Sequence, residues 1–244
     1  PLLNKKTEGV IADQISSSKK ESIESLSKFP FIHKEIINIG ERLEKNTLPL
    51  KEVIQFSEFD EENLPKYEQE KHALLENIGQ IKALVENELK IYKSYRDKLS
   101  NASKKKEMLD KVKQNKEDIA TAIQSIKISN KLIKKLGKRV EKAANKIEEK
   151  EVIVKENEPV LNKLLAKKNQ SEDDKKEIER LIVLVRSSAK GIKKLEQEMG
   201  VSKETMTKYL RQFARAQYKD KRAKDDLAKA NLRLVVNIAK KYVN

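Results

Sequence analysis

The residues best suited to do chemistry lie near the end of the chain, in the segment from Leu227 to Asn244. At about 100° per residue, a helix over this segment has a polar and mostly cationic stripe made of Arg222, Asp226, Lys229, Arg233, Asn237 and Lys240. The other side is apolar, and we expect it to be buried: Leu227, Leu234, Val235, Ile238 and Tyr242. A cationic stripe of this kind attracts phosphates or carboxylates.

Asn231 interrupts that apolar side, one turn before Leu234 and Val235. A buried amide that finds no partner costs about 1–3 kcal/mol, so the side chain must have a use. Two interpretations remain open on helix geometry alone. Asn231 either hydrogen-bonds to a neighbouring helix or faces a ligand.

The sequence carries none of the usual signatures of catalysis or metal binding. It has no cysteine, and two isolated histidines, His33 and His72, cannot form a zinc site, so we expect them to be surface or partly packed residues. No Ser/His/Asp pattern, phosphate-binding loop or paired-glycine motif occurs. We therefore expect a protein that binds rather than catalyses, without metal or cofactor.

Residues 230–242, Ala-Asn-Leu-Arg-Leu-Val-Val-Asn-Ile-Ala-Lys-Lys-Tyr, closely resemble the start of the second conserved region of bacterial primary sigma factors. Residues 200–206 and 214–227 are similar to the basic segment that precedes it in that family. Residues 1–15, Pro-Leu-Leu-Asn at their head, are similar to the family's region 1.2 helix. Gly9, Asp13 and Gln14 depart from the family pattern there, which suggests a diverged lineage.

The resemblance implies a fragment of a transcription initiation factor that joins core RNA polymerase, at the clamp of its largest subunit, and directs it to promoters. It implies a pocket for a flipped base of the non-template strand, at the downstream end of the −10 element, formed by Glu8, Asn231 and Leu234. Arg233, Lys240 and Lys241 would supply basic contacts to DNA or to the clamp. Because the chain stops inside a conserved helix, we expect the piece to bind promoter DNA weakly and to be unable to open it.

The resemblance also suggests three segments. Residues 1–56 would be the region 1.2-like helices, residues 57–199 a helical non-conserved insert lying against the polymerase, and residues 200–244 the run-in and first helix of region 2. In this family the glycine and capped helix at 200–210 do not read a DNA groove.

Composition favours an all-α fold. Charged residues make up 38% and hydrophobic residues 37% of the chain, while glycine, proline and aromatic residues are scarce. The longest aliphatic run, residues 181–185, is far shorter than the roughly 20 residues of a membrane span, and no signal peptide is present, so we expect a cytosolic protein.

The net charge of +15 is concentrated near the end of the chain. Residues 201–244 hold twelve Lys and Arg against four acidic residues. This excess fits phosphate contacts or an acidic protein partner equally well.

Hydrophobic periodicity predicts a bundle of helices. Asn4 is expected to cap the first, Pro159 to begin another, and Gly200 to end the one before the basic segment. The remaining helices are predicted at 19–28, 30–45, 48–56, 66–99, 119–154 and 171–199, with a connection at 57–65 and a break at 101–106.

Two other functions remain open. A helix-turn-helix regulator could use Lys203, Thr207 and Lys208 to read a major groove, although Ser202 after a glycine is more typical of an ordinary helix cap. A helical scaffold or coiled-coil protein would explain residues 66–199. The lysine pairs in that stretch are expected to be solvated helix faces, as are Lys104 to Lys106.

Overall fold

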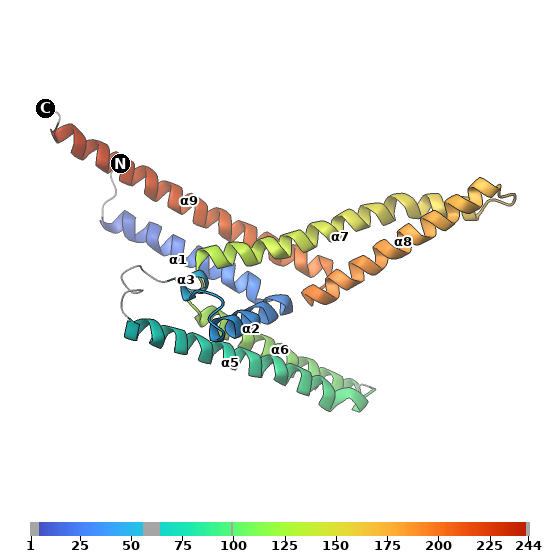
Figure 1. The fold of residues 1–244 in the computed structure, drawn as a ribbon, viewed down its shortest axis with the longest axis horizontal. Coiled ribbons are helices and arrows are strands. Elements are labelled where there is room, and N and C mark those ends of the chain that lie inside the picture. The colour runs from blue at the N-terminus through green and yellow to red at the C-terminus, as the bar shows by residue number, and fades with distance from the viewer. Residues whose placement is uncertain (1–4, 56–63, 99, 243–244) are drawn as a thin grey trace.

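The computed structural model describes residues 5–55, 64–98 and 100–242, and almost all of them are helical. This confirms the all-α, multi-helix fold. The helices, shown in Figure 1, are α1 (Lys5–Ser27), α2 (Pro30–Glu44), α3 (Leu50–Val53), α5 (Leu64–Tyr95), η1 (Arg96–Lys98), α6 (Ala102–Ser125), α7 (Asn130–Leu165), α8 (Glu172–Met199) and α9 (Lys203–Tyr242).

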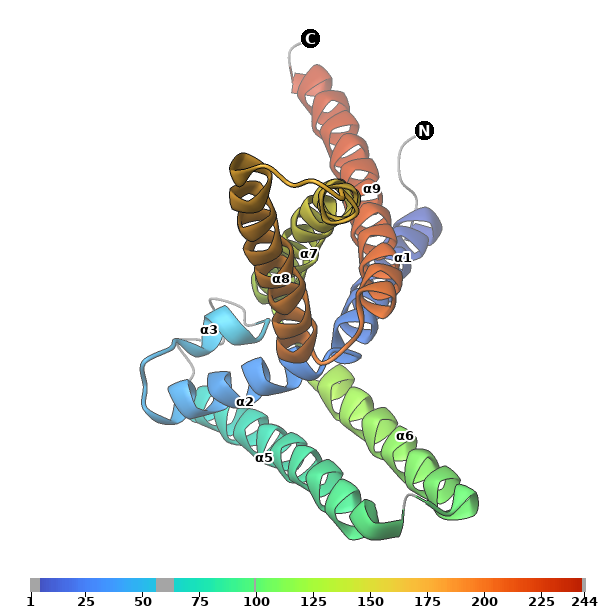
Figure 2. The same cartoon turned by 90° about the vertical axis from the view of Figure 1, so that its right-hand side faces the viewer.

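The helices form a central group from which two helical hairpins extend. Figures 1 and 2 show α5 and α6 as one hairpin and α7 and α8 as the other, with α9 lying beside α1. The ends of α1 and α9 nearest the two termini lie at the same end of the molecule. The pair is therefore antiparallel, and it joins the two extremes of the sequence.

One large hydrophobic core holds the central group together. It takes buried residues from α1, α2, α3, α5, α6, α7, α8 and α9, so all three predicted segments contribute to it. Phe29, between α1 and α2, is fully buried and meets the ring of Tyr209 on α9 edge to face, with 5.5 Å between ring centroids. Such aromatic pairs add about 0.5–1.5 kcal/mol beyond the area they bury.

The boundaries of α8 were predicted correctly because they depend on local signals. Ser171 caps the helix, with its Oγ accepting from the Asp174 N–H while the Asp174 carboxylate accepts from the Ser171 N–H. Gly200 ends it with φ of 76°, in the left-handed region that favours glycine. A β-carbon there would lie only 2.6 Å from the Pro30 ring at the start of α2. Both the positive φ and this lack of space therefore favour glycine over any other residue.

Three boundaries predicted from apolar spacing were wrong, and so was the break expected at 101–106, where Asn101 caps α6 and the helix begins at Ala102. Helix α1 runs unbroken to Ser27, where separate helices were expected, and Pro159 lies inside α7 instead of starting a helix. The predicted helix at 119–154 is divided between α6 and α7. Apolar spacing continues across each of the three boundaries, so periodicity alone could not locate them.

The division between α6 and α7 has a tertiary cause. Ile128 forms an isolated antiparallel bridge with Ile54, and the Ser129 N–H donates to the Val53 carbonyl at 2.8 Å. Ser129 Oγ also donates to the Glu52 carbonyl at 2.9 Å and accepts from the Leu132 N–H. At this turn the backbone therefore gives up helical hydrogen bonds and bonds instead to the segment around Glu52, more than seventy residues away in the sequence.

In the described part of the chain, no helix combines the length and apolar character needed to cross a membrane. The predicted solvated lysine clusters, among them Lys104, Lys134, Lys167, Lys175 and Lys193, are all exposed. His72 is exposed as expected, whereas His33 is 4% exposed and belongs to the interior.

Candidate nucleic-acid interface

Small side chains allow α1 and α9 to approach closely. The buried residues of α1 include Ser18, Ser22 and Ser25, and those of α9 include Ala216, Ala223 and Ala230. The hydroxyls of Ser22 and Ser25 donate to the carbonyls of Ser18 and Glu21 within the same helix. These two buried hydroxyls can therefore lie in the contact between the helices with their hydrogen bonds made.

Two polar contacts fix the register of the pair. Gln217 Nε2 donates to Ser22 Oγ at 2.9 Å, and Lys219 Nζ reaches both carboxylate oxygens of Glu21 at 3.0 and 2.8 Å. The Glu21–Lys219 pair is solvent-exposed, so its contribution to stability is at most about 1 kcal/mol. The pair nevertheless shows which residues of α1 and α9 lie opposite one another.

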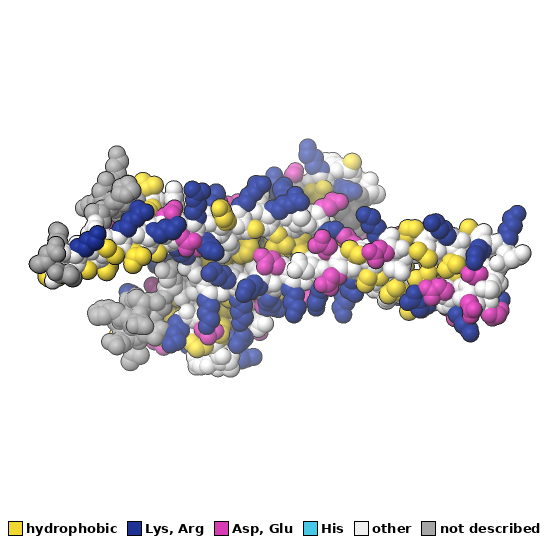
Figure 3. Space-filling model, turned by 90° about the horizontal axis from the view of Figure 1, so that it is seen from above, with side chains coloured by type: hydrophobic (Ala, Val, Ile, Leu, Met, Phe, Trp, Pro, Cys, Tyr) yellow, Lys and Arg dark blue, Asp and Glu magenta, His cyan; other side chains and the backbone are white. Residues whose placement is uncertain are grey.

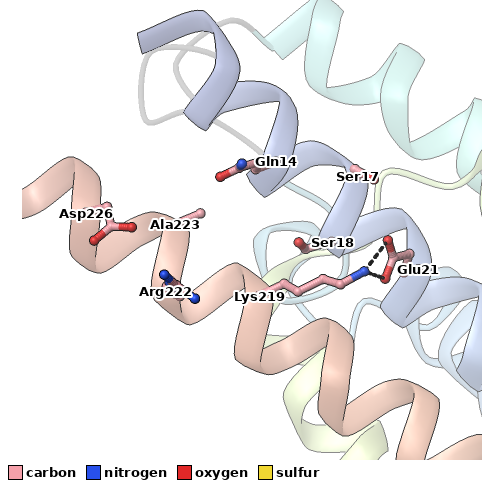
Figure 4. A pocket seen from close by; sticks show the side chains of 8 residues that line it. All are labelled: Gln14, Ser17, Ser18, Glu21, Lys219, Arg222, Ala223 and Asp226. Atoms are coloured by element: carbon pink, nitrogen blue, oxygen red, sulfur yellow. Dashed lines mark hydrogen bonds and ion pairs between the residues drawn. The ribbon is translucent and has the colours of Figure 1, made fainter. Parts of the chain in front are cut away.

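A groove of about 560 Å³ opens along one side of this pair. In Figure 4 the ion pair between Lys219 and Glu21 spans the two helices, while Arg222 and Asp226 continue along α9. The residues that line the groove are Gln14, Ser17, Ser18, Glu21, Lys219, Arg222, Ala223 and Asp226. This lining is hydrophilic and mixed in charge, as suits the binding of a polar molecule.

The register brings the predicted pocket residues to the same level. Glu8 lies as far before Glu21 on α1 as Leu232 lies after Lys219 on α9, which sets Glu8 level with the turn that carries Asn231. Glu8 also continues the stripe of Ile11, Ile15, Ser18 and Ser22 that faces α9. By this count Glu8 falls at the level of the turn that carries Asn231, and both lie beyond Ala230, the last buried residue of α9 among those described.

The predicted site residues on α9 are exposed. Asn231, Arg233 and Lys240 face solvent, Leu234 is 48% exposed, and the side chain of Lys241 lies outside the described residues. Glu8 is exposed as well. Asn231 is therefore not a buried amide satisfied by a neighbouring helix.

The prediction that the apolar side of this segment is buried was wrong. Val235 is 60% exposed and Tyr242 85% exposed, while Leu227 is half-buried and Ile238 exposed. The reason is geometric, because every buried residue of α9, among those described, lies at or before Ala230, so the rest of the helix extends beyond the packed part of the molecule. Figure 3 shows hydrophobic side chains on the surface toward the left end of the molecule, where this part of α9 extends.

A buried charge cluster lies under the same pair of helices and was not predicted. Asp220 is 7% exposed; one carboxylate oxygen accepts from Lys224 at 2.6 Å, and the other has no hydrogen-bond partner among the described residues. Lys19 on α1 is partly buried nearby, and burial lowers its pKa together with repulsion from Lys224, against the opposing effect of Asp220. Lys19 donates to Gln55, so the cluster also ties α1 to the segment after α3.

The contacts of Lys203 and Thr207 weigh against a recognition helix. Lys203 is ion-paired with Glu151 on α7, and the Thr207 hydroxyl donates to the Lys203 carbonyl. Met206, between them, is fully buried. They begin a 40-residue helix whose first turn packs against α7, with the Thr205 N–H bonded to Ser202 Oγ as the cap prediction expected.

The sequence prediction assigned Arg211 and Arg215 to no site, and used Lys208 only in the helix-turn-helix alternative. Lys208, Arg211 and Arg215 continue the same stripe toward the start of the helix, and all three are exposed. The signal was present in their spacing of three and four residues, but it required treating residues 203–242 as one helix.

No protein-family model matches this chain.

Proposed function

We propose that this chain is part of a bacterial primary sigma factor, which binds core RNA polymerase and contacts the non-template strand of the −10 promoter element. The proposal rests first on the resemblance of residues 230–242 to the second conserved region of that family. Its role is binding rather than catalysis, and the place of action would be the bacterial cytoplasm.

The observation that best supports the proposal is the antiparallel packing of α1 on α9. The two helices that carry the segments resembling conserved sigma-factor regions are separated by most of the chain, yet they pack side by side, with contacts from Ser22 to Gln217 and from Glu21 to Lys219. A scaffold of helical hairpins has no need to bring Glu8 level with Asn231. A base-binding pocket built from both segments does.

The exposure of Asn231 and Leu234 suits an extruded base. An amide can form hydrogen bonds with the edge of a base, while an aliphatic side chain covers its face. Arg233 and Lys240, exposed on the neighbouring stripe, can contact the phosphates on either side. Because Leu234 is half exposed, a base that covers it gains part of the apolar burial that the free protein lacks.

The test measures binding of a fluorescent non-template −10 oligonucleotide and of variants altered at the downstream base. The variants Asn231→Ala and Leu234→Ala should remove the preference for the native base, worth about 1–3 kcal/mol for a good amide contact. Asn162→Ala is the matched control, since this exposed amide lies on α7, outside both the proposed pocket and α9. An unchanged base preference in Asn231→Ala would contradict the pocket assignment.

A second experiment addresses the polymerase. Core RNA polymerase immobilised on a surface should retain this chain. The retention should be the same with and without promoter DNA. The alternative function is a helical scaffold, favoured by the two long hairpins α5/α6 and α7/α8. Absence of both polymerase retention and base preference would leave that scaffold role in place of the proposed one.

A further inference from the structure

A single row of cations follows the whole length of α9. Helix α9 is continuous from Lys203 to Tyr242, so residues spaced by three or four positions stay on one face throughout. We call this face the outer stripe; it contains eight cations and one acid. Its residues are Lys208, Arg211, Arg215, Lys219, Arg222, Asp226, Lys229, Arg233, Asn237 and Lys240. At 1.5 Å per residue the outer stripe is about 50 Å long.

The outer stripe is solvated and largely unpaired. All eight of its cations are exposed. Lys219 is ion-paired with Glu21, and none of the other seven has an ion-pair or hydrogen-bond partner for its side chain among the described residues. The buried face of α9, marked by Met206, Phe213 and Ala216, points elsewhere, so the stripe is not needed for folding.

Two grooves flank the outer stripe. Lys219 and Arg222 line the groove against α1. A second groove of about 570 Å³ contains Lys208, Arg211 and Arg215, together with Lys203, Glu204, Thr207, Gln212 and, from α7, Glu151. Because Glu151 is already paired with Lys203, the net charge left for a ligand in the second groove is positive.

An exposed aromatic side chain lies within the row. Tyr218 is 68% exposed, one turn after Arg215 and one turn before Arg222. An aromatic ring between two guanidinium groups offers a base a surface on which to stack, with phosphates held on both sides. Duplex DNA keeps its base faces stacked inside, and an acidic protein has no flat bases, so this ring favours an unpaired strand.

We propose that the outer stripe of α9 binds a single strand of nucleic acid without regard to sequence, with phosphates along the cations and a base stacked on Tyr218. The stripe shares Arg233 and Lys240 with the proposed −10 contacts, and to that extent the inference rests on the proposed function. It adds Lys208 to Arg222, which would carry the strand along the helix toward α7. It does not depend on the pocket of Glu8, Asn231 and Leu234.

The first test removes three cations of the second groove. Binding of a labelled oligothymidine of about 16 nucleotides is followed by fluorescence anisotropy at several salt concentrations. The triple variant Lys208→Gln, Arg211→Gln, Arg215→Gln should weaken binding and reduce the slope of log K against log salt by about 2, at about 0.7 per phosphate contact.

The matched control is Lys190→Gln, Lys193→Gln, Lys194→Gln on α8, which changes the net charge equally at exposed positions. The control should leave the slope unchanged. Equal weakening by both triples would overturn the proposal, because binding would then follow net charge alone. Circular dichroism checks that both variants keep their helices.

The second test concerns Tyr218. Tyr218→Leu should weaken oligothymidine binding by roughly 5- to 150-fold, the effect of losing one stacked base. Tyr92→Leu, at an exposed position of α5, is the control and should have no effect. Unchanged affinity of Tyr218→Leu would overturn the stacking part of the proposal.

Competitors identify the partner. Tighter binding of a duplex than of either of its strands, or displacement of the oligonucleotide by poly-glutamate at equal charge, would overturn the proposal in favour of duplex DNA or an acidic protein. The affinities for oligothymidine and oligouridine are then compared, and the tighter of the two identifies DNA or RNA as the preferred strand. An unchanged base preference in Asn231→Ala, together with weaker oligothymidine binding in the triple variant, would contradict the proposed pocket and leave this inference standing.

Discussion

The choice of glycine at position 137 of α7 follows from a contact with α9 rather than from helix propensity. Gly137 is buried in the first third of α7, and a β-carbon there would overlap the ring of Phe213 from α9. Alanine would gain up to about 1 kcal/mol in helix propensity. Overpacking against a buried ring costs about 1–3 kcal/mol and outweighs that gain.

We therefore expect Gly137→Ala to lower the free energy of unfolding, measured by urea denaturation. Gly79→Ala is the control, because Gly79 lies in α5 with open space around it and should be stabilised by the same substitution. Adding Phe213→Leu to Gly137→Ala should recover part of the loss. Stabilisation by Gly137→Ala would show that α7 and α9 are not in close contact.

His33 links stability to pH. The buried ring donates from Nε2 to the Ser27 carbonyl at 2.7 Å. Its pKa is lowered, mainly by burial and to a smaller degree by Lys116, while the Ser27 bond opposes the shift. Below its ordinary value of 6.5 the unfolded chain binds a proton here that the folded chain does not, so stability falls as the pH drops.

The urea midpoint should fall between about pH 7.5 and about pH 5.5, and His33→Gln should make this fall smaller. Glutamine keeps a donor for the Ser27 carbonyl but does not titrate in this range. His72→Gln, at an exposed position, should leave the pH dependence as it is in the original protein. Identical pH profiles for His33→Gln and the original chain would argue against a neutral, buried His33.

Among the elements, the α1–α9 pair depends on the size of its contact residues. Ala216 on α9 is fully buried against α1, whereas Ala214 on the same helix is exposed. A leucine at position 216 would force the helices apart, and we expect Ala216→Leu to cost about 1–3 kcal/mol. Ala214→Leu should change stability by less than about 0.5 kcal/mol, as surface substitutions usually do.

The same variant tests how the candidate pocket is assembled. If Glu8 and Asn231 act together only because α1 and α9 are in register, Ala216→Leu should also reduce base preference on the −10 oligonucleotide without altering any proposed contact residue. Ala214→Leu should retain that preference. Retention by Ala216→Leu in spite of lower stability would mean that α9 binds the base without α1.

For the molecule as a whole, stability should be uneven. The outer part of the α7/α8 hairpin has a small cluster of its own, Leu161, Ile178 and Leu181, separate from the main core. Fewer buried contacts mean a lower free energy of local opening. Amide hydrogen exchange should therefore be faster at Leu161 and Ile178 than at Ile32, Leu43 and Ile133 in the main core. Equal protection in both places would indicate that the hairpin opens only with global unfolding.

Local signals explain which elements could be predicted. The ends of α8 follow from Ser171 and Gly200, whose side chain and backbone freedom act within one turn. The all-α class follows from composition and periodicity. The turn between α6 and α7 could not be predicted this way, because Ile128 and Ser129 leave the helix in order to pair with Ile54 and Val53.

The sequence by itself determined the helical class, the basic character of the last segment and the resemblance that singles out Glu8, Asn231 and Leu234. Each of these depends on residue type or on spacing within one helix. Only the tertiary structure decided that α1 packs on α9, that the apolar side of α9 beyond Ala230 is exposed, and that Gly137 receives Phe213. Such outcomes depend on which helices meet, and that is set by packing between residues distant in the chain.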